Sequence, residues 1–326
     1  MVAGGGQGIG GWIGKESASG SLVPIYAGAV VVGVIGYLIN RSRRDRRATR
    51  ARLARISPHG APGVITNVGK LGLRSLESLI LVVVLVALWQ WYTQANHPLY
   101  FTTPAGIWTD LRAHWFTGTP NKLRTALEPS IRRVAIGWLI AAVVGIGLGV
   151  AIGASRKLAP YVDPLVHFLR SLPPPAILPI FLVLFGIGDR MKIIFIAFGI
   201  VWPVLLNTIR GVRSVPALQI ETGRVFGVGR TRRLLQIVLP AAAPQIFAGL
   251  RVALSLALVL MVISEMVAAS GGIGFEILQG QASFDFPGMW AGIVVVGVVG
   301  VLLNALLSAV EHFALGWHRG ARMAAQ

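Results

Sequence analysis

Residues 134–154 read VAIGWLIAAVVGIGLGVAIGA, a stretch without a single charged side chain. A helix of about 20 mainly apolar residues is long enough to cross the hydrocarbon core of a bilayer. Because lipid offers no partner for backbone N–H and C=O groups, such a segment is predicted to be helical. This stretch therefore indicates an α-helical membrane protein.

Six further stretches resemble this one in length and apolarity. The chain of 326 residues is 54% hydrophobic and only 13% charged, whereas soluble domains carry about 25% charged residues. We therefore predict an all-α fold, a polytopic bundle of transmembrane helices. In chain order the candidate helices lie at about 22–39, 76–93, 134–154, 165–187, 191–208, 246–269 and 290–313.

Basic residues set the predicted orientation of these helices. The segment from Arg41 to Arg55 is dense in arginine, and such segments stay in the cytoplasm under the positive-inside rule. The N-terminus is then outside, whereas the loop with Arg156 and Lys157, the loop from Arg210 to Arg233 and the tail with Arg319 and Arg322 are inside. The outward connections are about 94–133, 188–190 and 270–289. The first of them holds Arg124, Arg132 and Arg133, which we expect where the third helix begins.

The chain divides by composition at about residue 70. Residues 1–70 are predicted to be an appendage with an extra transmembrane helix, Leu22 to Ile39, and a basic cytoplasmic linker, and residues 71–326 a six-helix core. Two alternatives for this appendage are an uncleaved signal anchor and a start codon assigned too far upstream. Its arginine run is suited to contact with anionic membrane lipid.

Several kinds of chemistry find no support in the sequence. Cysteine is absent and the six histidines are scattered, so no metal site or cofactor is expected. The net charge is +18, and its basic residues lie in short blocks beside the apolar runs. This placement indicates that they set the membrane topology, and no nucleic-acid partner is expected. Gly14-Lys15-Glu16 lacks the Ser or Thr of a phosphate-binding loop, and Gly6 to Gly11 matches G-x-G-x-x-G without a preceding strand. We expect no catalytic site.

Glycine and proline mark two places in the predicted bundle. Gly145, Gly149 and Gly153 are spaced four residues apart, which predicts a seam where another helix packs closely. The run from Ser171 to Pro179 contains three consecutive prolines; it is either a broken helix beside a transport pathway or an interfacial turn that starts a helix. Pro203 is expected to kink its helix. The candidate pathway or gate residues here are Pro174, Pro175 and Pro203.

Glu265 lies inside the apolar run from Leu256 to Met266. An unpaired carboxylate in hydrocarbon costs several kcal/mol, so this side chain must face protein or water. One interpretation is a pathway or gate residue, and the other is a partner in hydrogen bonds between helices near the outer interface. Both remain open.

The loop from Glu221 to Pro240 reads ETGRVFGVGRTRRLLQIVLP. It resembles the signature loop of ABC importer permeases, a glutamate, two small residues, three positions, glycine, nine positions and Ile-x-Leu-Pro. The residues in register are Glu221, Thr222, Gly223, Gly227, Ile237, Leu239 and Pro240, with Thr222 and Gly223 in place of the usual two alanines. Further similarity, to the nitrate, taurine and aliphatic sulfonate branch, extends over about residues 71–318.

This resemblance implies a function and a set of partners. The chain would be the permease of an ATP-driven importer in the bacterial cytoplasmic membrane, with about 209–245 as the coupling loop that docks in a separate ATPase subunit. A second permease copy, as a homodimer, and an extracytoplasmic substrate-binding protein are also implied. In such a chain Pro240 would end the coupling segment before the next membrane helix.

The substrate and one rival function remain open at this stage. An organic or inorganic anion such as a sulfonate, taurine or nitrate is our hypothesis, and Arg124, Arg132, Arg133 and Lys192 are compatible with anion passage or with lipid headgroup contact. A secondary ion-coupled carrier or a polytopic membrane enzyme is the alternative. Either should show several intramembrane carboxylates or histidines, and only Glu265 qualifies.

Overall fold

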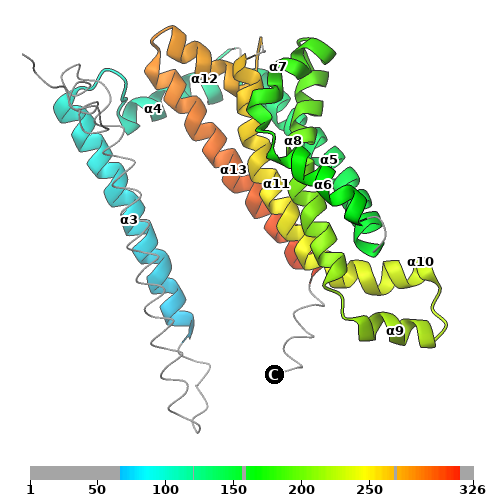
Figure 1. Ribbon diagram of the computed structural model, residues 1–326. Helices are drawn as coiled ribbons and strands as arrows, with labels where there is room; N and C mark the ends of the chain where they lie inside the picture. The colour runs from blue at the N-terminus through cyan, green and yellow to red at the C-terminus, as the bar shows by residue number, and fades with distance from the viewer. Residues whose placement is uncertain (1–66, 120, 156–158, 268–269, 316–326) are drawn as a thin grey trace, which may run out of the picture. The chain divides into compact units, whose positions relative to one another are not determined.

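The computed structural model describes residues 67–119, 121–155, 159–267 and 270–315 (Figure 1). Every regular element in these ranges is a helix, which confirms the all-α prediction. Contacts divide the chain into two units, Met1–Ala105 and Gly106–Gln326, and each is described by itself. The predicted helix at 22–39 and the basic linker after it lie outside the described residues.

The described part of the first unit is dominated by one helix. Helix α3 (Asn67–Asn96) covers the predicted span at 76–93. The chain then turns back on its C-terminal end, where the rings of Trp89 and Phe101 meet edge to face at 6.5 Å and Gln90 Oε1 accepts a hydrogen bond from Ala105 N at 3.1 Å. Helix α4 (Pro104–Asp110) carries the boundary between the units.

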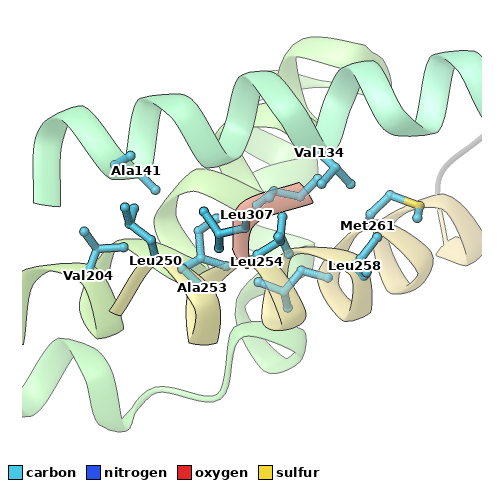
Figure 2. Packing of buried hydrophobic residues seen from close by; sticks show 14 of the residues in the cluster. Val134, Ala141, Val204, Leu250, Ala253, Leu254, Leu258, Met261 and Leu307 are labelled. Carbon is cyan, nitrogen blue, oxygen red and sulfur yellow. The ribbon is translucent and has the colours of Figure 1, made fainter. Parts of the chain in front are cut away.

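Three long helices build the core of the second unit. They are α5 (Glu128–Ala154), α8 (Asp189–Arg213) and α11 (Leu239–Val267), with α8 in contact with both of the others. Most of their buried side chains are apolar, and Figure 2 shows Val134, Ala141, Val204, Leu250 and Met261 packed between them. These helices are long and apolar enough to cross a membrane.

Helix α13 (Phe286–Ala314) is a fourth helix that can span the membrane. It packs along α11 but leaves most of its apolar surface uncovered within this chain. In a bilayer such a surface faces lipid or another membrane protein, because neither environment penalises it. Its large exposed side chains are Ile293, Val298, Val301, Leu302, Leu306, Val310 and Phe313.

The predicted helix at 165–187 is broken at the proline run, which was one of the two interpretations of residues 171–179. The chain forms two helices, α6 (Ala159–Ser171) and α7 (Pro174–Phe185), which meet at a bend of 92°. Pro173 has an extended backbone (ψ 119°) and Pro174 begins the new helix. A residue before proline is disfavoured in the α region, so consecutive prolines stop α6 and proline at the first turn starts α7.

Connections predicted as loops also contain helices. The outward connection at 270–289 holds α12 (Ile273–Ala282), and 94–133 holds α4 and the π-helical segments η2 (Leu111–Phe116) and η3 (Leu123–Leu127). The predicted coupling loop holds α9 (Ala217–Val225), α10 (Arg230–Arg233) and the π-helical segment η4 (Leu234–Val238). The helices in the two outward connections were missed because they are short and lack a long apolar run, whereas the family resemblance implies a short helix pair in the coupling loop.

Several prolines lie within helices, Pro240 and Pro203 among them. Pro240 was predicted to end the coupling segment before a helix that begins at 246. This prediction is wrong, because α11 begins at Leu239 and contains Pro240. The π-helical segment η4 runs directly into α11, so the chain is helical on both sides of Pro240. Helix α8 continues through Pro203, whose carbonyl accepts a hydrogen bond from Asn207 Nδ2 at 2.7 Å.

The predicted glycine seam is present on α5 and its partner is α8. A Cβ atom at Gly149 would lie 2.6 Å from Thr208 Cβ, and one at Gly145 would lie 2.9 Å from Val204. Gly153 faces Val212 in the same way, at 2.8 Å. The two backbones are therefore as close as they are because these positions lack side chains.

Replacing Gly149 with leucine is expected to force α5 away from α8. Overpacking of this kind costs about 1–3 kcal/mol, which would lower the thermal unfolding midpoint of the detergent-solubilised protein. Gly147→Leu is the matched control, because a Cβ atom at Gly147 has nothing within 4 Å. Equal midpoints for the two variants would contradict the seam.

Candidate functional site

Glu265 lies near the C-terminal end of α11 and is completely buried. Its Oε1 accepts a charge-assisted hydrogen bond from Arg133 Nη1 at 2.5 Å, and its Oε2 accepts one from Gly274 N at 3.0 Å. Ser130 Oγ lies 2.8 and 2.9 Å from the two oxygens. The carboxylate therefore has acceptor contacts on both oxygens and a cation beside it, which is what a buried charge requires.

Arg133 extends this network to α8. Its Nε and Nη2 donate to Asp189 Oδ1 at 2.8 and 2.7 Å, and Arg132 Nη2 donates to Asp189 Oδ2 at 2.7 Å. Both arginines lie near the start of α5, as the sequence predicted. We call Ser130, Arg132, Arg133, Asp189, Lys192 and Glu265 the polar cluster; it joins the ends of α5, α8 and α11.

The turn before α12 is built around the same carboxylate. Gly272 has φ +121°, and a Cβ atom there would lie 2.5 Å from the Glu265 carboxyl carbon. Ser130 Oγ accepts a hydrogen bond from Ile273 N at 3.0 Å, and Arg133 Nη1 donates to Gly271 O at 3.3 Å. Glycine is required here because any side chain at 272 would displace Glu265.

The proposed pathway and gate residues do not form one group. Glu265 has hydrogen-bond partners on other helices, which favours its interpretation as a residue that links helices. Its role as a pathway or gate residue stays a prediction. Pro174 lies where α7 meets α8, since a Cβ atom at Gly199 would come within 3.4 Å of it. Pro175 is exposed at the start of α7, and Pro203 is half-buried in α8.

The signature residues gather at the opposite end of α11, where α9 and α10 lie side by side (Figure 1). A Cβ atom at Gly223 would lie 2.7 Å from Ile237 Cδ1, so the small residue lets α9 pack on η4. Gly227 makes the turn with φ +70°. Glu221 and Thr222 are exposed, while Leu239 and Pro240 are half-buried at the start of α11.

The structure adds three residues that the signature did not include. Leu218, Val225 and Phe226 are 74%, 85% and 80% exposed, which is unusual for large apolar side chains in a segment flanked by arginines. They lie on α9 and directly after it. Exposed apolar groups rimmed by polar residues are typical of protein interaction sites.

Within the described ranges, no group of three or more His, Cys, Asp or Glu side chains is placed to hold a metal ion.

Comparison with known proteins gives consistent matches. The sequence family described as "Binding-protein-dependent transport system inner membrane component" matches residues 143–314. SsuC of Bacillus subtilis, proposed to be an aliphatic sulfonates transport permease, is 31% identical over 73% of this chain and 86% of its own length. The nitrate import permease NrtB of Leptolyngbya laminosa is 37% identical over 60% of this chain and 70% of its own.

A solved structure shares the fold. A chain of the MetNI methionine ABC transporter, described in inward-facing conformations, superposes with a TM-score of 0.53 at 19% identity. The match covers 58% of this chain and 94% of that one. This agrees with the predicted type of helical membrane bundle.

Glu265→Gln is expected to destabilise the protein because it removes the charge that pairs with buried Arg133. Loss of one partner of a buried ion pair costs about 3 kcal/mol or more, which thermal unfolding in detergent would detect. The control is Glu276→Gln, which breaks the partly exposed pair with Lys122 at 2.8 Å and should cost about 0–1 kcal/mol. Similar losses for both variants would argue against the buried network.

Proposed function

The chain belongs to the family of binding-protein-dependent transport system inner membrane components, and from that premise we propose that it imports a small anion by coupling α9 to a separate ATPase subunit. Membership makes it the multi-pass inner-membrane permease of an ABC importer and not an enzyme. An ATPase and a substrate-binding protein are partners of such a system. The anion and the docking residues are the proposed part.

Docking to the ATPase is proposed for α9 and the turn after it. The observation that carries it is the exposure of Leu218, Val225 and Phe226 next to the signature residue Glu221. Aromatic and aliphatic anchors supply most of the energy of protein interfaces when a partner buries them. Gly223 lets α9 pack on η4, which runs directly into α11, so a push on α9 would reach a membrane helix.

The orientation needed for this docking is supported by charge. Arginines surround α9 and α10, and basic segments between membrane helices favour the cytoplasmic side. The polar cluster then lies at the outer end, where a binding protein would deliver substrate. The basic residues of the cytoplasmic end are Arg210, Arg213, Arg224, Arg230, Arg232 and Arg233.

An anion is proposed as the substrate because relatives with different named substrates share this charge type. Sulfonates and nitrate both carry a delocalised negative charge over several oxygens, and the similarity to SsuC and NrtB is comparable.

We further propose that two copies pair around the pathway. The uncovered apolar faces of α5 and α13 are compatible with such a homodimer.

Phe226→Ser tests the docking proposal in the assembled transporter. We expect it to reduce the amount of ATPase subunit that co-purifies with the tagged permease, because a buried aromatic anchor contributes about 2 kcal/mol or more to an interface. The control is Phe284→Ser, which removes an exposed phenylalanine from the connection between α12 and α13, away from α9.

Glu221→Lys should act in the same direction as Phe226→Ser. Undiminished co-purification of the ATPase with both variants would contradict docking at α9, provided that the thermal midpoint of the permease is unchanged.

A further inference from the structure

Lys192 is the one member of the polar cluster whose charge has no direct partner among the described residues. It is only 3% exposed, in the first turn of α8. It follows Asp189 by three residues and so lies on the same face of α8. Its ammonium forms no ion pair or side-chain hydrogen bond with the described part of the chain, because Asp189 and Glu265 pair with Arg133 instead. Burying an ammonium group without hydrogen-bond acceptors costs free energy. We therefore expect Lys192 to bind an acceptor that is not part of the described chain.

The carboxylates of the cluster already have closer donors. Asp189 accepts from Arg132 and Arg133 through its two oxygens. Glu265 accepts from Arg133 and Gly274 N, with Ser130 beside both of its oxygens. Counted formally, three cations stand against two carboxylates, which leaves one positive charge in the cluster.

The position of Lys192 relates it to three helices. Lys192 and Gly199 are seven residues apart and so lie on the same face of α8. A Cβ atom at Gly199 would contact Leu260 of α11 and Pro174 of α7, so this face of α8 packs against α7 and α11. A helical side chain leans toward the N-terminus of its helix, which places the ammonium near the polar cluster, at the N-terminal end of this contact between α7, α8 and α11.

We propose that Lys192 binds the transported anion at this end of the bundle. The inference rests on the function proposed above, because a neutral or cationic substrate would not supply the missing acceptor. A nitrate or sulfonate oxygen would satisfy the ammonium and neutralise the surplus charge. A single lysine is a point charge on a flexible stem, so it holds an anion without enclosing it, and a transport site must also release its ligand.

The test is uptake of nitrate and of ethanesulfonate by the complete transporter, permease with ATPase and binding protein, reconstituted in vesicles. Lys192→Met is expected to lower the uptake rate about tenfold, since loss of a hydrogen bond to a charged group corresponds to at least that factor. Lys192→Arg keeps the charge and should retain most of the rate. Arg190→Met removes an exposed cation from the same turn of α8 and should have no effect.

Each other outcome has a distinct meaning. If wild-type transporter takes up the anions and Lys192→Met does so equally well, the inference is wrong while the proposed function stands. If the wild type takes up neither anion, the proposed anion class is wrong as well. If Lys192→Met fails to assemble, Lys192→Arg decides: a changed ratio of nitrate to ethanesulfonate uptake supports contact with the anion, and an unchanged ratio contradicts it.

Discussion

A charge inside a membrane protein must find its partners within the protein, because hydrocarbon provides none. Glu265 meets this constraint with Arg133, Ser130 and the backbone of the turn before α12. Through Arg133 the same network takes in Asp189 at the start of α8. One carboxylate thus fixes where three membrane helices end relative to one another, and it dictates the glycines of the turn. The remaining packing, apolar and non-directional, adjusts around these directional contacts.

The two ends of the second unit are built differently, and the difference suits a permease. At one end, charged side chains and close backbone turns hold α5, α8 and α11 together. At the other end, α9 exposes large apolar side chains and is attached through η4 to α11. The glycine seam holds α5 and α8 in close contact. In the proposed function, a displacement of α9 by the ATPase subunit would be transmitted through η4 and α11 to these packed helices.

Much of the fold could be predicted from the sequence, because membrane helices are long and their apolar runs are unambiguous. The seam at Gly145, Gly149 and Gly153 followed from spacing alone. Its partner α8 did not, since spacing reveals a face and not what covers it. The break at the proline run was one of two interpretations of the sequence. The helix α12 and the early start of α11 were missed because short helices carry weak periodic signals. Glu265 was identified as a residue that needs a partner. Arg133 and Asp189 are far from it in sequence, so only the folded chain shows the pairing.

In the proposed function this permease moves an anion with energy from ATP that a separate subunit hydrolyses. The most direct measurement is nitrate and ethanesulfonate uptake into vesicles that contain the complete transporter, with ATP, without ATP, and with ionophores that collapse ion gradients. We predict uptake that requires ATP and the binding protein and that persists when the gradients are collapsed. Uptake that continues without ATP and stops when the gradients collapse would show an ion-coupled carrier and contradict it.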